Sequence, residues 1–178
     1  ALACAEHAPT IWTLHDMWSF TGRCAYPGDC RTYLRGCGPD CPTPDQYPFY
    51  PSDKIRPAYA EKRKALASES RMAAVSPSAW LAEQARQGLW RHRPVRVIPN
   101  GLDLERYAPL GHGDRQKVRQ ELGITTDGPV LLSVAQYLDD PRKGMGLLLQ
   151  ALRLTGPRDG AITLLLMGQG QGQGSALD

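Results

Sequence analysis

The 178-residue sequence predicts an α/β fold that contains parts of two parallel-sheet domains. Short apolar runs rich in β-branched residues alternate with longer segments of helical periodicity, which is typical of parallel sheets with helices on their faces. Near the middle of the chain, residues 100–113 interrupt this alternation with turn residues and a proline. We therefore expect two incomplete Rossmann-like sheets, in residues 1–99 and 114–178, joined by an interdomain crossing at residues 100–113.

In the first domain, three apolar runs are expected to be strands and two periodic segments to be helices. Asp53 and Ser78 stand where they can cap the N-termini of these helices. The expected strands are residues 10–14, 72–75 and 95–98, and the expected helices are residues 53–70 and 79–88. Between the first strand and the first helix, residues 19–50 have neither period and are rich in Gly, Pro, Cys and Asp. This insertion is predicted to be a Cys-rich loop, and such long loops in compact domains are usually functional or held by cross-links.

The second domain is expected to alternate in the same way. Residues 130–135 are apolar throughout, which predicts a strand that is buried on both faces. The expected order is a helix at 114–122, this strand, a helix at 144–154 and a strand at 161–167 that ends at Gly168.

Composition limits the class of protein. The net charge of +3 is too small to indicate a nucleic-acid or membrane partner by itself. No apolar run approaches the roughly 18 to 20 residues of a membrane-spanning helix, and residues 1–10 do not have the pattern of a secretory signal. The chain begins without Met and ends in a tail of Gly and Gln, so we expect it to be a fragment. The expected location is the cytoplasm, including the inner face of the membrane.

A His–Asp pair, His15 and Asp16, follows the first expected strand. In an open parallel sheet, ligands bind outside the carboxyl ends of the strands, so this pair is well placed for chemistry. The alternative is a structural role, in which His15 ends the strand and satisfies a loop carbonyl.

A second candidate site is the sequence DDPRKG at residues 139–144, between an expected strand and an expected helix. Arg142 and Lys143 place two cations at a helix N-terminus, and Gly144 lets a ligand approach the backbone closely. This combination suits an anion such as the diphosphate that leaves when a nucleotide-sugar bond breaks. The alternative is an ordinary polar loop with solvated charges.

A third motif is Pro99-Asn100-Gly101, in which Asn-Gly can supply positive φ and Pro99 stiffens the exit from a strand.

The longer run VIPNGLDLERYAP resembles the interdomain signature of the group 1 (family 4) glycosyltransferases of GT-B architecture, whose two Rossmann domains face each other across the active-site cleft. Segments that resemble other parts of this family occur in the family's order: WTLHDMWSFTG, AAVSPSAWL, VLLSVAQYLDDPRKGMGLLLQAL and AITLLLMGQG. The similarity covers nearly the whole chain after residue 10.

The resemblance implies transfer of a sugar from a nucleotide-diphosphate-sugar donor to an acceptor hydroxyl, with retention, in surface polysaccharide or glycan biosynthesis. It implies a glycan or lipid-linked acceptor, no nucleic-acid partner and no cofactor for catalysis. By similarity, His15 would contact the sugar, Asp16 would hold the loop or His15, and Asn100 and Gly101 would form the hinge. The donor-binding residues that it implies are Arg142, Lys143, Gly144, Gly168 and Gly170.

The sequence also departs from the family pattern. Where the family has a Gly-Arg pair before Lys-Gly, this chain has Gln136-Tyr137-Leu138, and Arg142 directly precedes Lys143. The family's N-terminal glycine-rich loop and its paired glutamates are absent from residues 1–178. We therefore expect this chain alone to be inactive in sugar transfer.

Four cysteines, Cys24, Cys30, Cys37 and Cys41, lie within eighteen residues of the expected loop. Only Cys37 and Cys41 have the close separation that is usual in structural zinc sites. The segment resembles a cysteine-rich insertion in one branch of these glycosyltransferases. Structural zinc, disulfides and unmodified thiols all remain open, and a metal here would stabilise the loop rather than take part in catalysis.

The remaining candidates concern surfaces. Basic residues gather in and near the first expected helix, where they form either a solvated face or a contact with an anionic membrane: Lys54, Arg56, Lys62, Arg63, Lys64 and Arg71. Four aromatic residues in or near the loop could stack on an acceptor sugar or pack the loop down: Trp18, Phe20, Tyr26 and Tyr33. The alternative functions are a zinc-stapled binding module with a basic helix and an inactive remnant that only folds.

Overall fold

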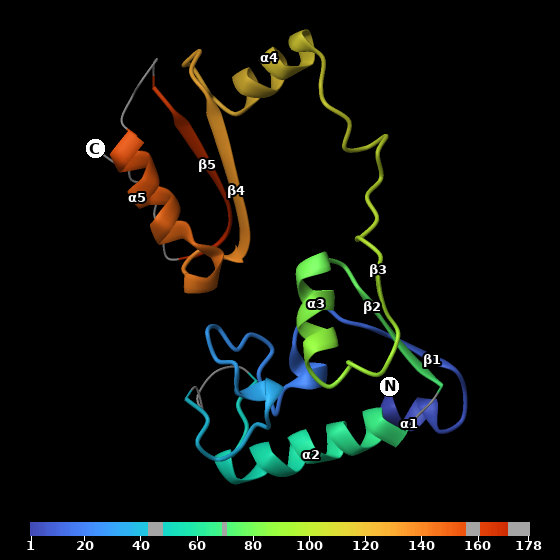
Figure 1. Cartoon of the computed structure of the whole chain (residues 1–178). Helices are drawn as coiled ribbons and strands as arrows, with labels where there is room; N and C mark the ends of the chain where they lie inside the picture. Colours follow the sequence, from blue (N-terminus) through green and yellow to red (C-terminus); the bar gives the residue numbers. More distant parts are fainter. Residues whose placement is uncertain (43–47, 69–70, 156–160, 171–178) are drawn as a thin grey trace. The chain divides into compact units, whose positions relative to one another are not determined.

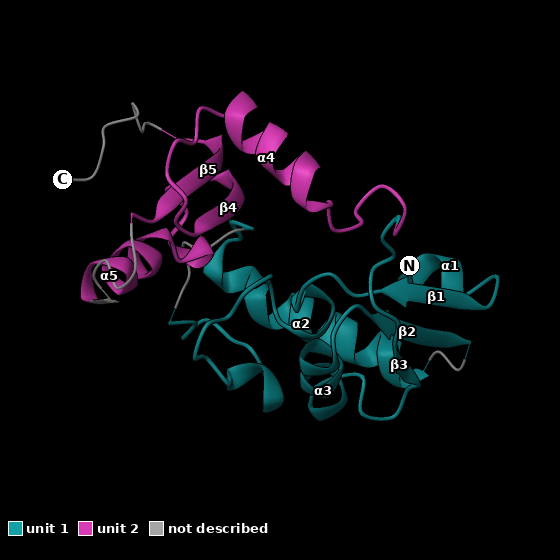
Figure 2. Cartoon of the chain, turned by 90° about the horizontal axis from the view of Figure 1, so that it is seen from above, with its two compact units in different colours: residues 1–103 teal, residues 104–178 magenta. Residues whose placement is uncertain are grey.

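The computed structural model describes residues 1–42, 48–68, 71–155 and 161–170 (Figure 1). By internal contacts the chain divides into two compact units, residues 1–103 and 104–178 (Figure 2). Both units contain parallel strands and helices, which confirms the predicted α/β class. No described helix is both long enough and apolar enough to cross a membrane.

The first unit is built on a parallel sheet with the order β1-β2-β3. The strands are β1 (Thr10–Thr13), β2 (Met72–Ser76) and β3 (Val95–Val97), and β2 pairs with both neighbours. The helices are α1 (Leu2–Ala5), α2 (Ser52–Ser68) and α3 (Ala79–Gln87). All three expected strands are confirmed; α2 starts one residue before Asp53, and residues 69–70 of the expected helix lie outside the described residues.

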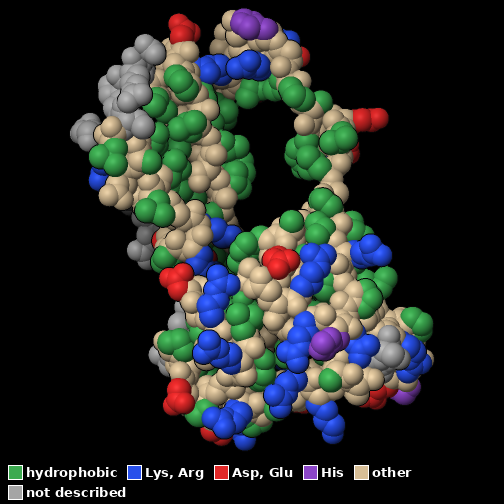
Figure 3. Space-filling view, viewed as in Figure 1, with side chains coloured by type: hydrophobic (Ala, Val, Ile, Leu, Met, Phe, Trp, Pro, Cys, Tyr) green, Lys and Arg blue, Asp and Glu red, His purple; other side chains and the backbone are tan. Residues whose placement is uncertain are grey.

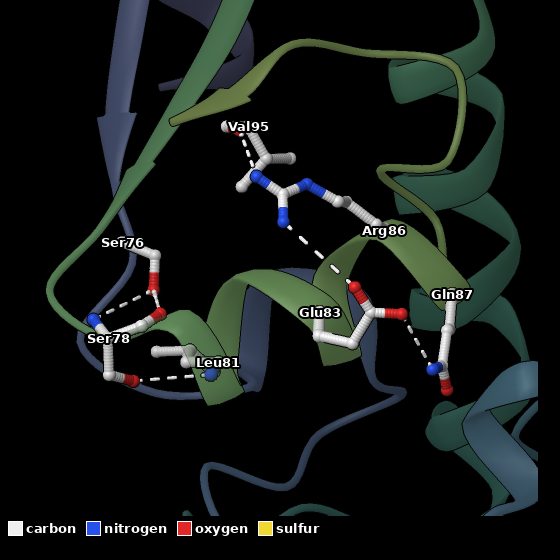
Figure 4. A network of polar contacts seen from close by, with 7 residues as sticks. All are labelled: Ser76, Ser78, Leu81, Glu83, Arg86, Gln87 and Val95. Atoms are coloured by element: carbon white, nitrogen blue, oxygen red, sulfur yellow. Dashed lines mark hydrogen bonds and ion pairs between the residues drawn. The ribbon is translucent and has the colours of Figure 1, made fainter. Parts of the chain in front are cut away.

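Hydrogen bonds between residues close in sequence hold the connection from β2 through α3 to β3 (Figure 4). The Leu81 N–H donates to the Ser78 hydroxyl over 3.2 Å, which confirms the predicted N-cap. At the other end of α3, the Arg86 guanidinium donates to the Val95 carbonyl over 2.7 Å. Helix α3 is thereby tied to the strand that follows it.

The first part of the expected loop after β1 packs into the core. It contains two 3-10 turns, Trp18–Phe20 and Thr32–Leu34, and residues 19–25 are all buried. Trp90, fully buried after α3, donates from its indole nitrogen to the Ser19 hydroxyl over 3.0 Å. Residues 43–47 of the expected loop lie outside the described residues.

The second unit contains α4 (His112–Glu121), β4 (Val130–Tyr137), a 3-10 turn at Pro141–Lys143, α5 (Met145–Thr155) and β5 (Thr163–Gln169). Strands β4 and β5 pair in parallel. The prediction that β4 is buried on both faces is wrong, because only Ala135 of β4 is buried. In the described residues the sheet has two strands, which leaves most side chains of β4 exposed.

Two glycine predictions are also wrong. Strand β5 continues through Gly168, where a side chain would overlap the Ala135 carbonyl oxygen, so the missing side chain permits pairing instead of ending the strand. Neither Asn100 nor Gly101 is among the residues with positive φ, and residues 98–103 have no regular structure.

Candidate functional site

The predicted His–Asp pair lies in a hollow at the carboxyl end of β1. The Leu14 N–H donates to the Val75 carbonyl over 2.7 Å, so the pairing with β2 ends just before His15. His15 is exposed and Asp16 is half-buried. The hollow has a volume of about 310 Å³ and is lined by residues 12–16, 18 and 19. The structure therefore brings His15 and Asp16 together with the aromatic wall of Trp12 and Trp18.

Asp16 organises the turn that leaves β1. One of its carboxylate oxygens accepts a 2.8 Å hydrogen bond from the Trp18 backbone N–H. This contact is of the kind that short acidic side chains make two residues ahead in turns. Asp16 thus contacts the loop backbone, as one of its two suggested roles requires.

Lys62 of α2 binds the backbone of the same turn. Its side chain is only 6% exposed, and its ammonium donates to the Trp18 carbonyl over 2.7 Å and to the Thr21 carbonyl over 3.1 Å. The ammonium also lies 3.7 Å from the centre of the Trp18 ring, within the range of a cation–π interaction. Burial lowers the pKa of Lys62 to about 8, while negative charge at Cys37 and Asp16 opposes this shift.

The buried position of Lys62 fits neither interpretation of the basic residues of α2, a solvated face or a contact with an anionic membrane. Lys62 follows Tyr59 by three residues and precedes Leu66 by four, and both of these side chains are buried. The spacing puts Lys62 on the apolar stripe of α2. This helical spacing could have predicted the burial of Lys62, but the many basic residues of the segment suggested an exposed position instead. The other cations of α2 are exposed, and Figure 3 shows Lys and Arg side chains over the visible face of this unit.

The cation pair of the second unit lies on the turn between β4 and α5. Asp140 accepts the Arg142 backbone N–H over 3.0 Å, and its two oxygens bind the guanidinium at distances of 2.6 to 3.1 Å. These bonds from Arg142 lower the pKa of Asp140 to about 2. The positive charge of Arg142 is therefore already compensated by a carboxylate at this position.

Lys143 and Gly144 complete the turn. Lys143 is exposed, and no carboxylate of a described residue lies within ion-pair distance of its ammonium. Gly144 has φ of 71°, a left-handed conformation that glycine adopts without strain, and its carbonyl accepts the Leu148 N–H as α5 begins. The first N–H groups of α5 have no helical acceptor, as at any helix N-terminus. An exposed ammonium thus precedes a helix N-terminus, which is the arrangement of an anion site.

Gly168 lies within β5 and Gly170 directly follows its last residue, and both come close to the end of β4. Gly168 approaches the Ala135 backbone, and Gly170 packs near the Leu138 side chain. The Leu138 N–H donates to the Gln169 carbonyl over 2.8 Å, which holds the two strand ends together. These close contacts explain why positions 168 and 170 are occupied by glycine. Binding of the sugar donor by these two glycines stays a prediction.

The four clustered cysteines line one hollow in the first unit, with a volume of about 110 Å³. Burial raises the pKa of Cys37 to about 11; the Gly22 N–H opposes the rise, and negative charge on the other three cysteines adds to it. Among the described residues, no disulfide joins any cysteine, and no three ligand side chains are already arranged to hold a metal ion. The zinc interpretation therefore stays a prediction.

The four aromatic candidates divide into two pairs. Phe20 and Tyr33 are buried and pack with their ring centres 5.8 Å apart, so they hold the loop down. Trp18 and Tyr26 are 42% and 51% exposed, so these two alone of the four are available to a sugar.

Comparison with known proteins agrees with the parallel α/β fold of the chain. The model of Glycosyltransferase Family 4 matches residues 1–106. A protein of Escherichia coli (strain K12), named as a glycosyl transferase of colanic acid biosynthesis, is 36% identical over 123 residues, which are 66% of this chain and 29% of that protein. The D-inositol 3-phosphate glycosyltransferase of Geodermatophilus obscurus is 39% identical over 74 residues, which are 39% of this chain and 15% of that protein.

The chain spans less than a third of the length of either relative. No solved structure matches it. Because the family model matches more than half of the residues, and both relatives are named as glycosyltransferases, the chain belongs to Glycosyltransferase Family 4.

Proposed function

We propose that this protein transfers a sugar from a nucleotide-diphosphate-sugar donor to an acceptor hydroxyl, with retention of the anomeric configuration, in surface polysaccharide biosynthesis. Membership of Glycosyltransferase Family 4 supports the reaction class. The name of the Escherichia coli relative, which refers to colanic acid biosynthesis, supports a polysaccharide product. The observation that carries the proposal is the exposed Lys143 ammonium directly before the N-terminus of α5.

The donor side of the reaction needs compensation of negative charge. A departing nucleoside diphosphate gains charge as its bond to the sugar breaks, and fixed positive groups at that point stabilise the transition state. Lys143 supplies a full charge, and the N-terminus of α5 supplies partial positive charge and N–H donors. Arg142 would keep its bond to Asp140 and hold the turn in shape, with Gly144 allowing the phosphates to approach the backbone.

The sugar side of the reaction is assigned to the hollow after β1. His15 would orient the sugar near the reaction centre, because its imidazole is exposed in that hollow. Asp16 and Lys62 would keep the wall of the hollow in place through their bonds to the backbone at Trp18. Catalysis would need no metal cofactor, and Asn100 and Gly101 would serve as the hinge between the two domains.

The exposed cations of α2 support contact with a lipid-linked acceptor at the inner face of a membrane, since basic segments are drawn to anionic lipid surfaces. This placement follows from charge alone. Lys62 takes no part in it, because its ammonium is buried against backbone carbonyls.

Calorimetric titration with UDP, GDP and ADP tests the donor site. One of these nucleotides is expected to bind, and Lys143→Ala should weaken its binding at least tenfold, about 1.4 kcal/mol. Lys117→Ala is the matched control, because Lys117 is an exposed lysine of the same unit that pairs with Asp114 in α4. Equal affinity for Lys143→Ala and wild type would contradict the role of Lys143. Salt-sensitive binding of DNA or RNA without any nucleotide effect would favour a zinc-stapled binding module instead.

A further inference from the structure

We propose that Cys24, Cys30, Cys37 and Cys41 form a tetrathiolate site for one Zn²⁺ ion, which stabilises the segment behind the sugar-side hollow. Two of the four residues, Cys24 and Cys30, precede the second 3-10 turn of the loop, and the other two, Cys37 and Cys41, follow it. All four nevertheless line the same hollow of about 110 Å³. The fifth cysteine, Cys4, lies in α1, is exposed and does not line the hollow.

The backbone between the cysteines turns in a way that brings them together. Gly28 lies between Cys24 and Cys30 with φ of 56°, and Gly36 directly precedes Cys37 with φ of 141°. Both conformations are rare for residues with side chains. The first two intervals between cysteines therefore each contain a turn that glycine makes accessible.

Gly22 shows how closely the segment is packed around Cys37. A side chain at position 22 would place its first carbon 2.6 Å from the Cys37 Cβ and 2.6 Å from the Ile55 Cγ2. The absence of that side chain lets the backbone come close to Cys37, and the Gly22 N–H lowers the pKa of the Cys37 thiol against the larger effect of burial.

The charges around the hollow suit a site with excess negative charge. Four thiolates and one Zn²⁺ carry a net charge of two negative units. Arg23 and Arg56 line the same hollow together with one carboxylate, that of Asp40, and the charge of Lys62 interacts with Cys37 and Cys24. An all-sulfur donor set favours zinc over magnesium or calcium, which prefer oxygen ligands.

Binding requires the ligands to move, because no three ligand side chains of the described residues are already arranged around a metal position. Each cysteine side chain can rotate about χ1, and the sulfurs would have to close to about 2.3 Å from the ion. One sulfur, that of Cys30, now lies 2.6 Å from the Thr32 hydroxyl, a polar contact that a metal bond would replace.

The site would act on the hollow after β1 through a short chain of contacts. The Thr21 hydroxyl donates to the Cys24 carbonyl over 2.6 Å, and the Thr21 carbonyl accepts from Lys62, which also binds the Trp18 carbonyl. A metal that fixes Cys24 would therefore fix the backbone that carries the Trp18 wall. This inference does not depend on the transfer reaction.

Metal analysis of protein purified without chelators, by inductively coupled plasma mass spectrometry, tests the proposal. Wild type and Cys4→Ser are expected to contain one zinc per chain, and Cys37→Ser is expected to contain less than a tenth of that. Because Cys37→Ser could fail to fold, metal-free wild type is also titrated with Co²⁺. An intense visible spectrum together with a sulfur-to-cobalt charge-transfer band is expected for four thiolates in a tetrahedral arrangement.

Three results would overturn the proposal. The first is wild type without stoichiometric zinc and without the cobalt spectrum. The second is zinc that remains when all four cysteines are replaced by serine. The third is an intact mass that lacks four hydrogen atoms, which would show that the cysteines form two disulfides instead.

Discussion

The ammonium of Lys62 lies 3.7 Å from the centre of the Trp18 ring and also donates to the carbonyl oxygen of the same residue. One side chain of α2 thus holds both the ring and the backbone of the residue that lines the hollow after β1. The second bond of Lys62, to the Thr21 carbonyl, extends this hold into the cysteine-rich segment.

Replacing Lys62 should therefore destabilise the first unit. Lys62→Ala removes two charge-assisted hydrogen bonds from buried or half-buried carbonyls, which predicts a loss of about 2 to 4 kcal/mol in urea unfolding. Lys64→Ala, at an exposed position two residues later, should change stability by less than about 0.5 kcal/mol. Equal stability of the two variants would show that the Lys62 contacts contribute little.

The same residue predicts a pH dependence of stability. The folded protein releases the Lys62 proton near pH 8, whereas the unfolded chain holds it to about pH 10.5. Between these values the unfolded state binds more protons, so the contribution of Lys62 to the free energy of unfolding rises with pH. The difference in stability between wild type and Lys62→Met should therefore shift in favour of wild type from pH 8 to pH 10.5. A difference that is constant over this range would contradict the lowered pKa.

Gly22→Ala should disturb the cysteine-rich segment. The added carbon would meet the Cys37 Cβ and the Ile55 Cγ2 at 2.6 Å, and overpacking of this kind costs about 1 to 3 kcal/mol. Gly38→Ala is the control in the same loop, since its added carbon meets the Arg56 guanidinium at an ordinary 3.5 Å. Chemical denaturation of both variants checks the prediction, which fails if they are equally stable.

Asp140→Asn should strengthen nucleotide diphosphate binding about three- to tenfold. The change keeps an oxygen for the Arg142 N–H but removes the carboxylate that compensates the guanidinium. A phosphate would then approach Arg142 and Lys143 with one fewer negative charge beside them. Asp139→Asn makes the same change in net charge at the exposed neighbouring position and should have a smaller effect in the same titration. Weaker binding by Asp140→Asn would indicate that Asp140 positions Arg142 for the phosphate.

Local patterns predicted the elements of this chain well. The apolar runs in the first unit became β1, β2 and β3, and Ser78 caps α3 as its residue type indicated. These features depend on neighbouring residues, which a single sequence displays. The burial of β4 was predicted wrongly because it depends on how many strands and helices surround it.

The candidate site was predictable where it depends on residue type and not where it depends on tertiary contacts. His15, Asp16 and Lys143 lie at strand or helix ends, as expected. The pairing of Arg142 with Asp140 followed from a turn geometry that the sequence does not display. The sequence suggested a turn at Gly168, whereas the close approach of the Ala135 carbonyl explains why this position is glycine.

Helix α2 contacts the cysteine-rich segment through residues on successive turns, and this has a consequence for how the protein can change during evolution. Ile55, Tyr59 and Lys62 all face that segment, and the Tyr59 hydroxyl donates to the Tyr33 carbonyl over 2.7 Å. One residue inserted between Tyr59 and Lys62 would turn Lys62 by about 100° relative to Tyr59, because an α-helix has 3.6 residues per turn. Substitutions at the exposed positions of α2 should therefore be frequent among homologues, whereas insertions or deletions within this stretch should be nearly absent.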